Sequence, residues 1–147
     1  MWRSSLEVCQ IATGRCRVVL RSPHLIEAPN WHPDGWFLVN GDGQLWRADM
    51  SGLTPIDTGG LTRCNNDHGF LPDGRIIFSC HDAQGAGIHV LDADGVKPVP
   101  VGRPSWWHSA HDRLIAYACA RQDRAVRIAT LDMEAVSYTH LTLPTSD

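Results

Sequence analysis

The residues best suited to chemistry form one short stretch, Asn65, Asn66, Asp67 and His68. Their amide, carboxylate and imidazole groups donate, accept or titrate, and four such side chains between two apparent strands point to a cavity, a ligand or a demanding turn. A turn signal, Pro72-Asp73-Gly74, follows shortly after, because proline and glycine supply the fixed φ and the permissive φ of a tight turn. Whether the four side chains form a site therefore depends on the elements that position them.

Two further groups of polar and aromatic side chains stand at comparable places, Asn30-Trp31 and Trp107-His108. If these segments are neighbouring strands, they bring imidazole, amide, carboxylate and indole groups into one pocket suited to a sugar, a peptide end or a metal-bound carboxylate. The predicted ligand-binding residues are Asn30, Trp31, Asn65, Asn66, Asp67, His68, Trp107 and His108. The sequence identifies no catalytic residue.

Three roles remain open for His68 and His108. Each imidazole can join strands by hydrogen bonds, which is a structural role. The two rings with Asp67 can bind a divalent metal ion, although no short-range ligand spacing supports this and no metal site is predicted. His68 can also act as a general base beside Asp67, but neighbouring strand residues point to opposite faces of a sheet, which weakens a simple Asp-His dyad.

Other chemical readings find little support in the chain. It contains no Gly-x-Ser-x-Gly elbow, no phosphate-binding loop and no His-Glu-x-x-His motif, so hydrolase, nucleotide-binding and zinc-protease functions have no motif behind them. His81-Asp82 and His89 are expected on an outer strand or loop, in contact with solvent.

Composition and charge indicate an ordinary globular protein. The 147 residues are 43% hydrophobic and 20% charged, and the formal net charge is -3. We expect no nucleic-acid partner, because there is no basic run to follow a phosphate backbone. The sequence shows no membrane span and no secretory signal, so we expect a cytoplasmic protein, or a periplasmic one if a leader has been lost.

The five cysteines, Cys9, Cys16, Cys64, Cys80 and Cys119, are odd in number and widely spaced, with no Cys-x-x-Cys pair. This spacing disfavours a disulfide framework and a cysteine zinc site. We therefore expect small buried residues in a reducing compartment.

The elements that position the candidate residues form a repeat of short strands. Pro33-Asp34-Gly35 returns as Pro72-Asp73-Gly74, which is 39 positions later (72 minus 33), and a third copy follows about 38 positions on. Self-similarity at this period, with four short strands per unit, is typical of propeller blades. The expected units are a hairpin at 6–22, blades at 27–60 and 63–101, and an incomplete blade at 103–132, within a partial propeller at 1–134.

The motifs in these units resemble a known family. Pro-Asn-Trp-His-Pro-Asp-Gly at 29–35 and the later Pro-Asp-Gly, each followed by paired strands, look like the WD40-like (PD40) repeat of TolB-type propellers. The run from Ser4 to Asp132 is similar to soluble TolB-related proteins often labelled biopolymer transporter Tol, most specifically at Cys64-Asn65-Asn66-Asp67-His68-Gly69. The resemblance implies an all-β fold, a partial β-propeller in which about three four-stranded blades form an open arc after an N-terminal hairpin.

Two segments depart from the family pattern. The third copy lacks Pro-Asp-Gly: His68 to Ile77 covers nine steps, whereas His108 to Ile115 covers seven. If the two histidines are equivalent, the third turn is two residues shorter. The segment 136–147 resembles translated sequencing adapter, so we expect a truncated protein with a non-native tail. Exposed blade faces and strand edges are expected to make such an arc prone to aggregation.

The resemblance implies two alternative functions. The first is a non-catalytic, cofactor-free module that binds a protein or a small or saccharide ligand at the axial face of the propeller. The alternative is a metal-dependent carbohydrate-active enzyme similar to oligogalacturonate-lyase propellers, in which His68 and His108 would help to hold manganese. Whether the protein is an enzyme stays open at this point, because a fold alone does not choose between them.

Overall fold

The computed structural model describes residues 1, 3–120 and 125–134, and the regular elements in these ranges are all β-strands. The predicted non-native tail at 136–147 lies outside the described residues. The described ranges contain no helix long and apolar enough to cross a membrane. Their strands form four antiparallel sheets, so the predicted all-β class is confirmed.

Each sheet is built from strands that follow one another in the chain. The first sheet is a hairpin of β1 (Ser4–Cys9) and β2 (Cys16–Ser22). The second contains β3 (Glu27–Trp31), β4 (Phe37–Gly41), β5 (Gln44–Asp49) and β6 (Gly52–Pro55). The third contains β7 (Cys64–Phe70), β8 (Ile76–Asp82), β9 (Gly85–Asp92) and β10 (Gly95–Pro98). The fourth contains β11 (Ser105–His111), β12 (Leu114–Ala120) and β13 (Val126–Asp132).

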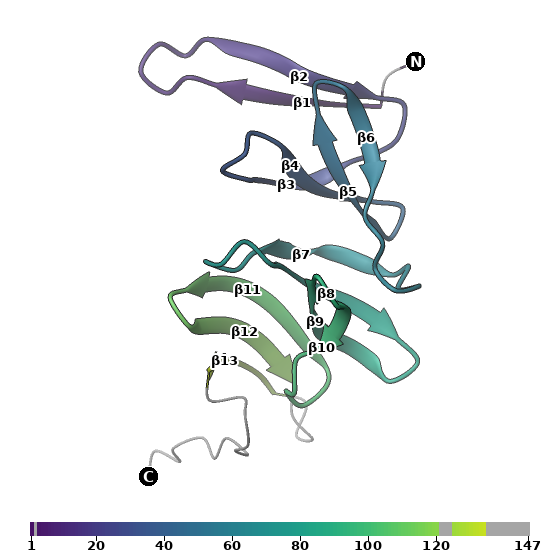
Figure 1. Ribbon diagram of the computed structural model, residues 1–147, viewed down its shortest axis with the longest axis vertical. Helices are drawn as coiled ribbons and strands as arrows, with labels where there is room; N and C mark the ends of the chain where they lie inside the picture. The colour runs from purple at the N-terminus through teal and green to yellow at the C-terminus, as the bar shows by residue number, and fades with distance from the viewer. Residues whose placement is uncertain (2, 121–124, 135–147) are drawn as a thin grey trace.

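The sheets follow one another along the long axis of the molecule, from the hairpin at one end to β11–β13 at the other (Figure 1). In each of the last three sheets the first strand of the unit lies at one edge. These three edge strands are neighbours, because β7 contacts both β3 and β11. Successive four-stranded meanders packed face to face are the blade arrangement of a propeller.

The second strand of each blade is buried on both faces along most of its length, which explains why most of its residues are apolar. Successive strand residues point to opposite faces of a sheet. Val39 in β4 therefore packs toward the hairpin with Leu6, while its neighbour Leu38 packs toward the next blade with Phe78. Burial between sheets on both sides fixes the blades relative to one another.

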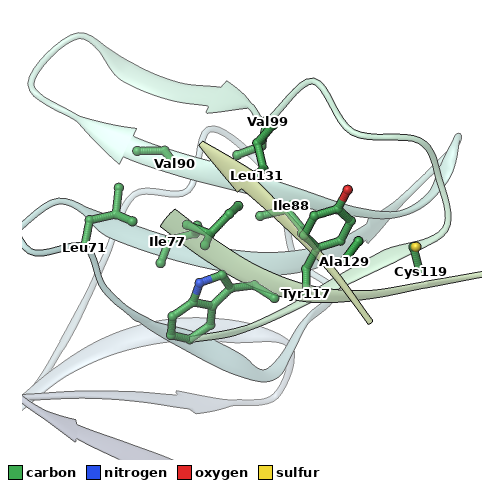
Figure 2. Packing of buried hydrophobic residues seen from close by; sticks show 11 residues of the cluster. Leu71, Ile77, Ile88, Val90, Val99, Tyr117, Cys119, Ala129 and Leu131 are labelled. Carbon is green, nitrogen blue, oxygen red and sulfur yellow. The ribbon is translucent and has the colours of Figure 1, made fainter. Parts of the chain in front are cut away.

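An apolar cluster likewise fills the space between the third and fourth sheets (Figure 2). Ile77 and Ile88 from the third sheet meet Ile115 and Tyr117 from the fourth, and all four side chains are at most 5% exposed. Burial of a large apolar side chain contributes about 1.5–3 kcal/mol. This cluster therefore holds β11 firmly beside β7.

The turns after the inner strands have the conformations expected from the sequence. Gly35 and Gly74 have φ of +87° and +88°, and the Asp73 carboxylate accepts a hydrogen bond from the Arg75 backbone at 3.0 Å. The third turn is shorter, since His111 pairs directly with Leu114.

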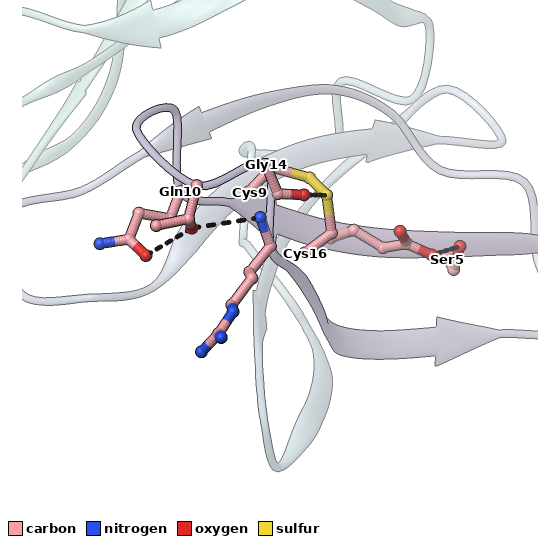
Figure 3. Close-up of a disulfide and its surroundings, with 8 residues drawn as sticks. Ser5, Cys9, Gln10, Gly14 and Cys16 are labelled. Carbon is pink, nitrogen blue, oxygen red and sulfur yellow. Dashed lines mark hydrogen bonds between the residues drawn. A yellow bond between two sulfur atoms is a disulfide. The ribbon is translucent and has the colours of Figure 1, made fainter.

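The cysteine prediction was wrong at one pair. Cys9 and Cys16 form a disulfide across the tip of the β1–β2 hairpin, where they are register partners with Cα atoms 3.9 Å apart (Figure 3). The hairpin register brings the two residues together although seven positions separate them in the chain, a proximity that spacing alone did not reveal. Cys64, Cys80 and Cys119 are buried free thiols, as expected.

The disulfide gives a first testable prediction. Alkylation of the denatured, unreduced protein should modify three cysteines, and alkylation after reduction should modify five, as counted by intact mass. Cys9→Ser is the control, because it should raise the unreduced count to four. Five modified cysteines in the unreduced wild type would contradict the pairing. Disulfides are rare in the cytosol, so the cytoplasmic placement stays a prediction. Counting the modified cysteines in protein taken directly from cells would test it.

Candidate functional site

The three inner strands line an open pocket of about 310 Å³, which we call the axial pocket. Six residues of the predicted ligand-binding set line it: Asn30, Asn66, Asp67, His68, Trp107 and His108. Ala28 and Pro29 complete its described lining. The structure therefore brings together members of the predicted set that are up to 78 positions apart in the sequence (108 minus 30), as the predicted strand convergence requires.

Two members of the predicted set lie elsewhere. Trp31 stacks on Phe37, with ring centroids 5.1 Å apart, and is 57% exposed. It follows Asn30 on β3, so alternation along the strand turns its side chain away from the pocket. Asn65 supports the pocket indirectly, because its amide donates to the Asp67 carboxylate at 2.7 Å and its oxygen accepts from the Asp67 backbone at 3.2 Å.

His68 is a structural histidine between two blades. It is 2% exposed. Its Nε2 lies 3.0 Å from Asn40 Oδ1, and its Nδ1 lies 3.3 Å from the Asn30 amide nitrogen. The amide oxygen accepts and the amide nitrogen donates, which fits a neutral ring protonated on Nε2. Burial lowers the pKa of His68 to about 4, which keeps it neutral at physiological pH.

Asn40 is the residue that sequence reasoning missed. It is 4% exposed in β4, and its amide nitrogen donates to Asn66 Oδ1 at 2.7 Å while its oxygen faces His68. The equivalent position one repeat later is Ser79 (40 plus 39), whose hydroxyl accepts from the Trp107 backbone at 2.8 Å. A polar residue at the same repeat position inside two apolar strands was the signal that could have revealed these links between blades.

Trp107 forms one wall of the pocket because Gly69 leaves room for it. A Cβ on Gly69 would stand 2.5 Å from a carbon of the indole ring. The indole is 6% exposed, and its Nε1 has no hydrogen-bond partner among the described residues. The close approach of Trp107 to β7 therefore depends on a glycine at this position.

Asp67 and His108 are the titratable pair that faces the pocket. Asp67 Oδ1 lies 3.9 Å from His108 Nδ1, and the two side chains are 23% and 52% exposed. This distance is too long for a direct hydrogen bond. The pair therefore leaves room for a third group between its two atoms.

The residues of the pocket do not fit a metal ion. Both nitrogens of His68 face amide groups of the protein. In the described ranges, no three His, Cys, Asp or Glu side chains are placed to hold a metal ion. The manganese-dependent alternative gains no support from this geometry.

His89 differs from its expectation as a solvated group. It is 4% exposed, because Pro98 pairs opposite it and its ring stacks on Phe78, with ring centroids 5.5 Å apart. The neighbouring Asp82 forms an ion pair with Arg103. The pKa of the Asp82 carboxyl is lowered, chiefly because the carboxylate accepts a hydrogen bond from the Arg103 guanidinium. This outer cluster ties the linker before β11 to the β8–β9 turn.

Comparison with known proteins supports the fold more than the function. No protein-family model matches the chain. It is 38% identical over 151 residues to the uncharacterized protein Atu1656 of Agrobacterium fabrum, a match that covers 95% of this chain and 51% of that protein. The chain thus spans about half the length of the curated relative it matches. The crystal structure of TolB from Acinetobacter baumannii superposes with a TM-score of 0.70 at 19% identity, over 88% of this chain and 35% of TolB. The fold is therefore that of part of a TolB-like β-propeller.

Proposed function

We propose that the axial pocket is the ligand-binding site of a non-catalytic propeller module, which takes a small or saccharide ligand or a segment of a partner protein. The observation that carries the proposal is the convergence of three successive inner strands on one polar pocket. Pockets with a few convergent polar groups beside an aromatic wall are the usual form of a ligand site.

The chemistry of the lining favours binding over catalysis. The described lining residues include no hydroxyl, thiol or amine side chain that could serve as a nucleophile. His68 is neutral, buried and engaged by two amides, so it is poorly placed to accept a proton from a substrate. Asp67 and His108 offer hydrogen bonds without forming a dyad.

A pair of variants three residues apart on β11 tests this proposal. His108→Trp should fill the pocket, whereas His111→Trp changes a side chain that is 92% exposed and does not line it. We would screen peptides, saccharides and small metabolites against the wild-type chain by ligand-observed NMR. Hits should be lost in His108→Trp and kept in His111→Trp. Hits that survive in both variants, or a screen without hits, would contradict the proposal.

A further inference from the structure

The three inner strands each contain a register irregularity before the turn into the second strand of the blade. The register shifts lie between Glu27 and Asn30 in β3, between Cys64 and His68 in β7, and between Trp107 and Ser109 in β11. Bulges re-aim side chains and occur often beside functional sites. Each irregularity leaves inner-strand residues without a register partner, among them Ala28, Asp67 and His108.

The pairing of each inner strand with its neighbour identifies these positions. Asn30 pairs with Leu38, Gly69 with Ile77, and Ala110 with Ile115, which are equivalent partners in the repeat. Ala28, Asp67 and His108 each lie two residues before the inner-strand member of one of these pairs. All three line the axial pocket. His108 is thus equivalent to Asp67, so His68 and His108 do not occupy equivalent positions of the repeat.

The three bulge residues differ in what they offer a ligand. Ala28 brings only a methyl group, and its carbonyl already accepts from the Asn30 amide at 3.0 Å. Asp67 brings a carboxylate that the Asn65 amide fixes through Oδ2, while Oδ1 faces His108. The described lining contains no lysine or arginine to balance this carboxylate. A cationic ligand would therefore meet the Asp67 carboxylate without a lysine or arginine of the described lining beside it.

We propose that Asp67 and His108 select a primary ammonium group, either a peptide amino terminus or a small free amine. This deepens the proposed function and rests on it. A nitrogen about 2.8 Å from both atoms of a pair 3.9 Å apart subtends an angle of roughly 90°, which tetrahedral donors accommodate with modest bending. An ammonium can donate to the Asp67 carboxylate and to His108 Nδ1 at once, and its charge balances that of Asp67. An alcohol fits the same two atoms but brings no charge.

Matched probes on the full chain separate these chemistries. We would record amide and indole NMR shifts during titration with Ala-Ala-Ala amide, the same peptide N-acetylated, butylamine, 1-butanol and methyl glucoside. The free peptide or butylamine should shift the resonances of Asn66, Asp67 and Trp107, and the acetylated peptide and 1-butanol should not. Binding by butylamine alone would point to a small amine, and binding by the free peptide would point to an amino terminus.

Two variants assign the effect to the pair. Asp67→Asn keeps the shape of the side chain and removes its charge, so it should weaken amine binding at least about tenfold, as expected for loss of a charged hydrogen bond. Asp34→Asn, an exposed turn residue outside the pocket, should leave binding unchanged.

Equal binding of the acetylated and free peptides, or no effect of Asp67→Asn, would overturn the amine proposal. Methyl glucoside shifting the same resonances without any amine response would overturn it while leaving the proposed function intact. If none of the five probes shifts these resonances, the amine proposal is overturned. The broader ligand screen with His108→Trp would then test whether the axial pocket binds any ligand.

Discussion

Gly43→Ala is expected to lower the free energy of unfolding by about 3 kcal/mol or more, because it combines backbone strain with an overlap that cannot be relieved by a side-chain rotation. Gly43 has φ of +77°, and a Cβ there would stand 2.2 Å from the Thr62 carbonyl oxygen. Its own carbonyl accepts from the Cys64 backbone at 2.8 Å. The substitution therefore pushes on the chain where it enters β7, the strand that carries Asp67. Urea unfolding followed by tryptophan fluorescence measures the loss.

Gly74→Ala is the matched control for this prediction. Gly74 has nearly the same backbone strain, with φ of +88°, but nothing lies within 4 Å of a Cβ built there. We expect it to cost only about 1 kcal/mol, from the positive φ alone. Equal losses in the two variants would show that the conformation, and not the contact with Thr62, determines stability at Gly43.

The sequence was sufficient for the fold because its signals are local and repeated. Pro-Asp-Gly fixes the turn after the inner strand in two blades, and the apolar runs around Leu38 and Ile77 are explained by burial on both faces. A spacing of 39 residues then relates one blade to the next without any knowledge of distant contacts. The hairpin disulfide was missed because it depends on register, which sets Cys9 opposite Cys16.

The site was predictable in outline but not in its division of roles. Strand convergence explains why six of the eight chosen residues meet in one pocket. The bulges in β7 and β11 were not visible in the sequence, and they determine that Asp67 and His108 share a position. Three roles were open for His68 from the sequence, and its contacts with amides of the preceding blade, Asn30 and Asn40, favour the structural one. The structural role of His68 and the pocket-facing roles of Asp67 and His108 become distinct only when the relative positions of the blades are known.

The structural role of His68 predicts a loss of stability on mild acidification. Burial lowers the pKa of His68 to about 4 from an ordinary value of 6.5, so between these values the unfolded chain binds more protons than the folded one. The free energy of unfolding is therefore highest above pH 6.5 and falls as the pH drops toward 4. For His68 alone the loss between pH 7 and pH 4.5 should be about 2.5 kcal/mol. Urea unfolding at several pH values measures it.

Variants at three histidines show whether the slope belongs to His68. His68→Gln should lower stability at pH 7, since it disturbs the contacts with Asn30 and Asn40, but it should remove most of the dependence between pH 7 and pH 4.5. His89→Gln should remove a smaller part, because burial, with the nearby charge of Arg103, also lowers the pKa of His89. His111→Gln, at a side chain that is 92% exposed, should leave the slope unchanged.

Carboxylates with lowered pKa, such as Asp73, lose their contribution only at more acidic pH, so they do not create this slope. An unchanged slope in His68→Gln would mean that the ring is not held neutral between the blades.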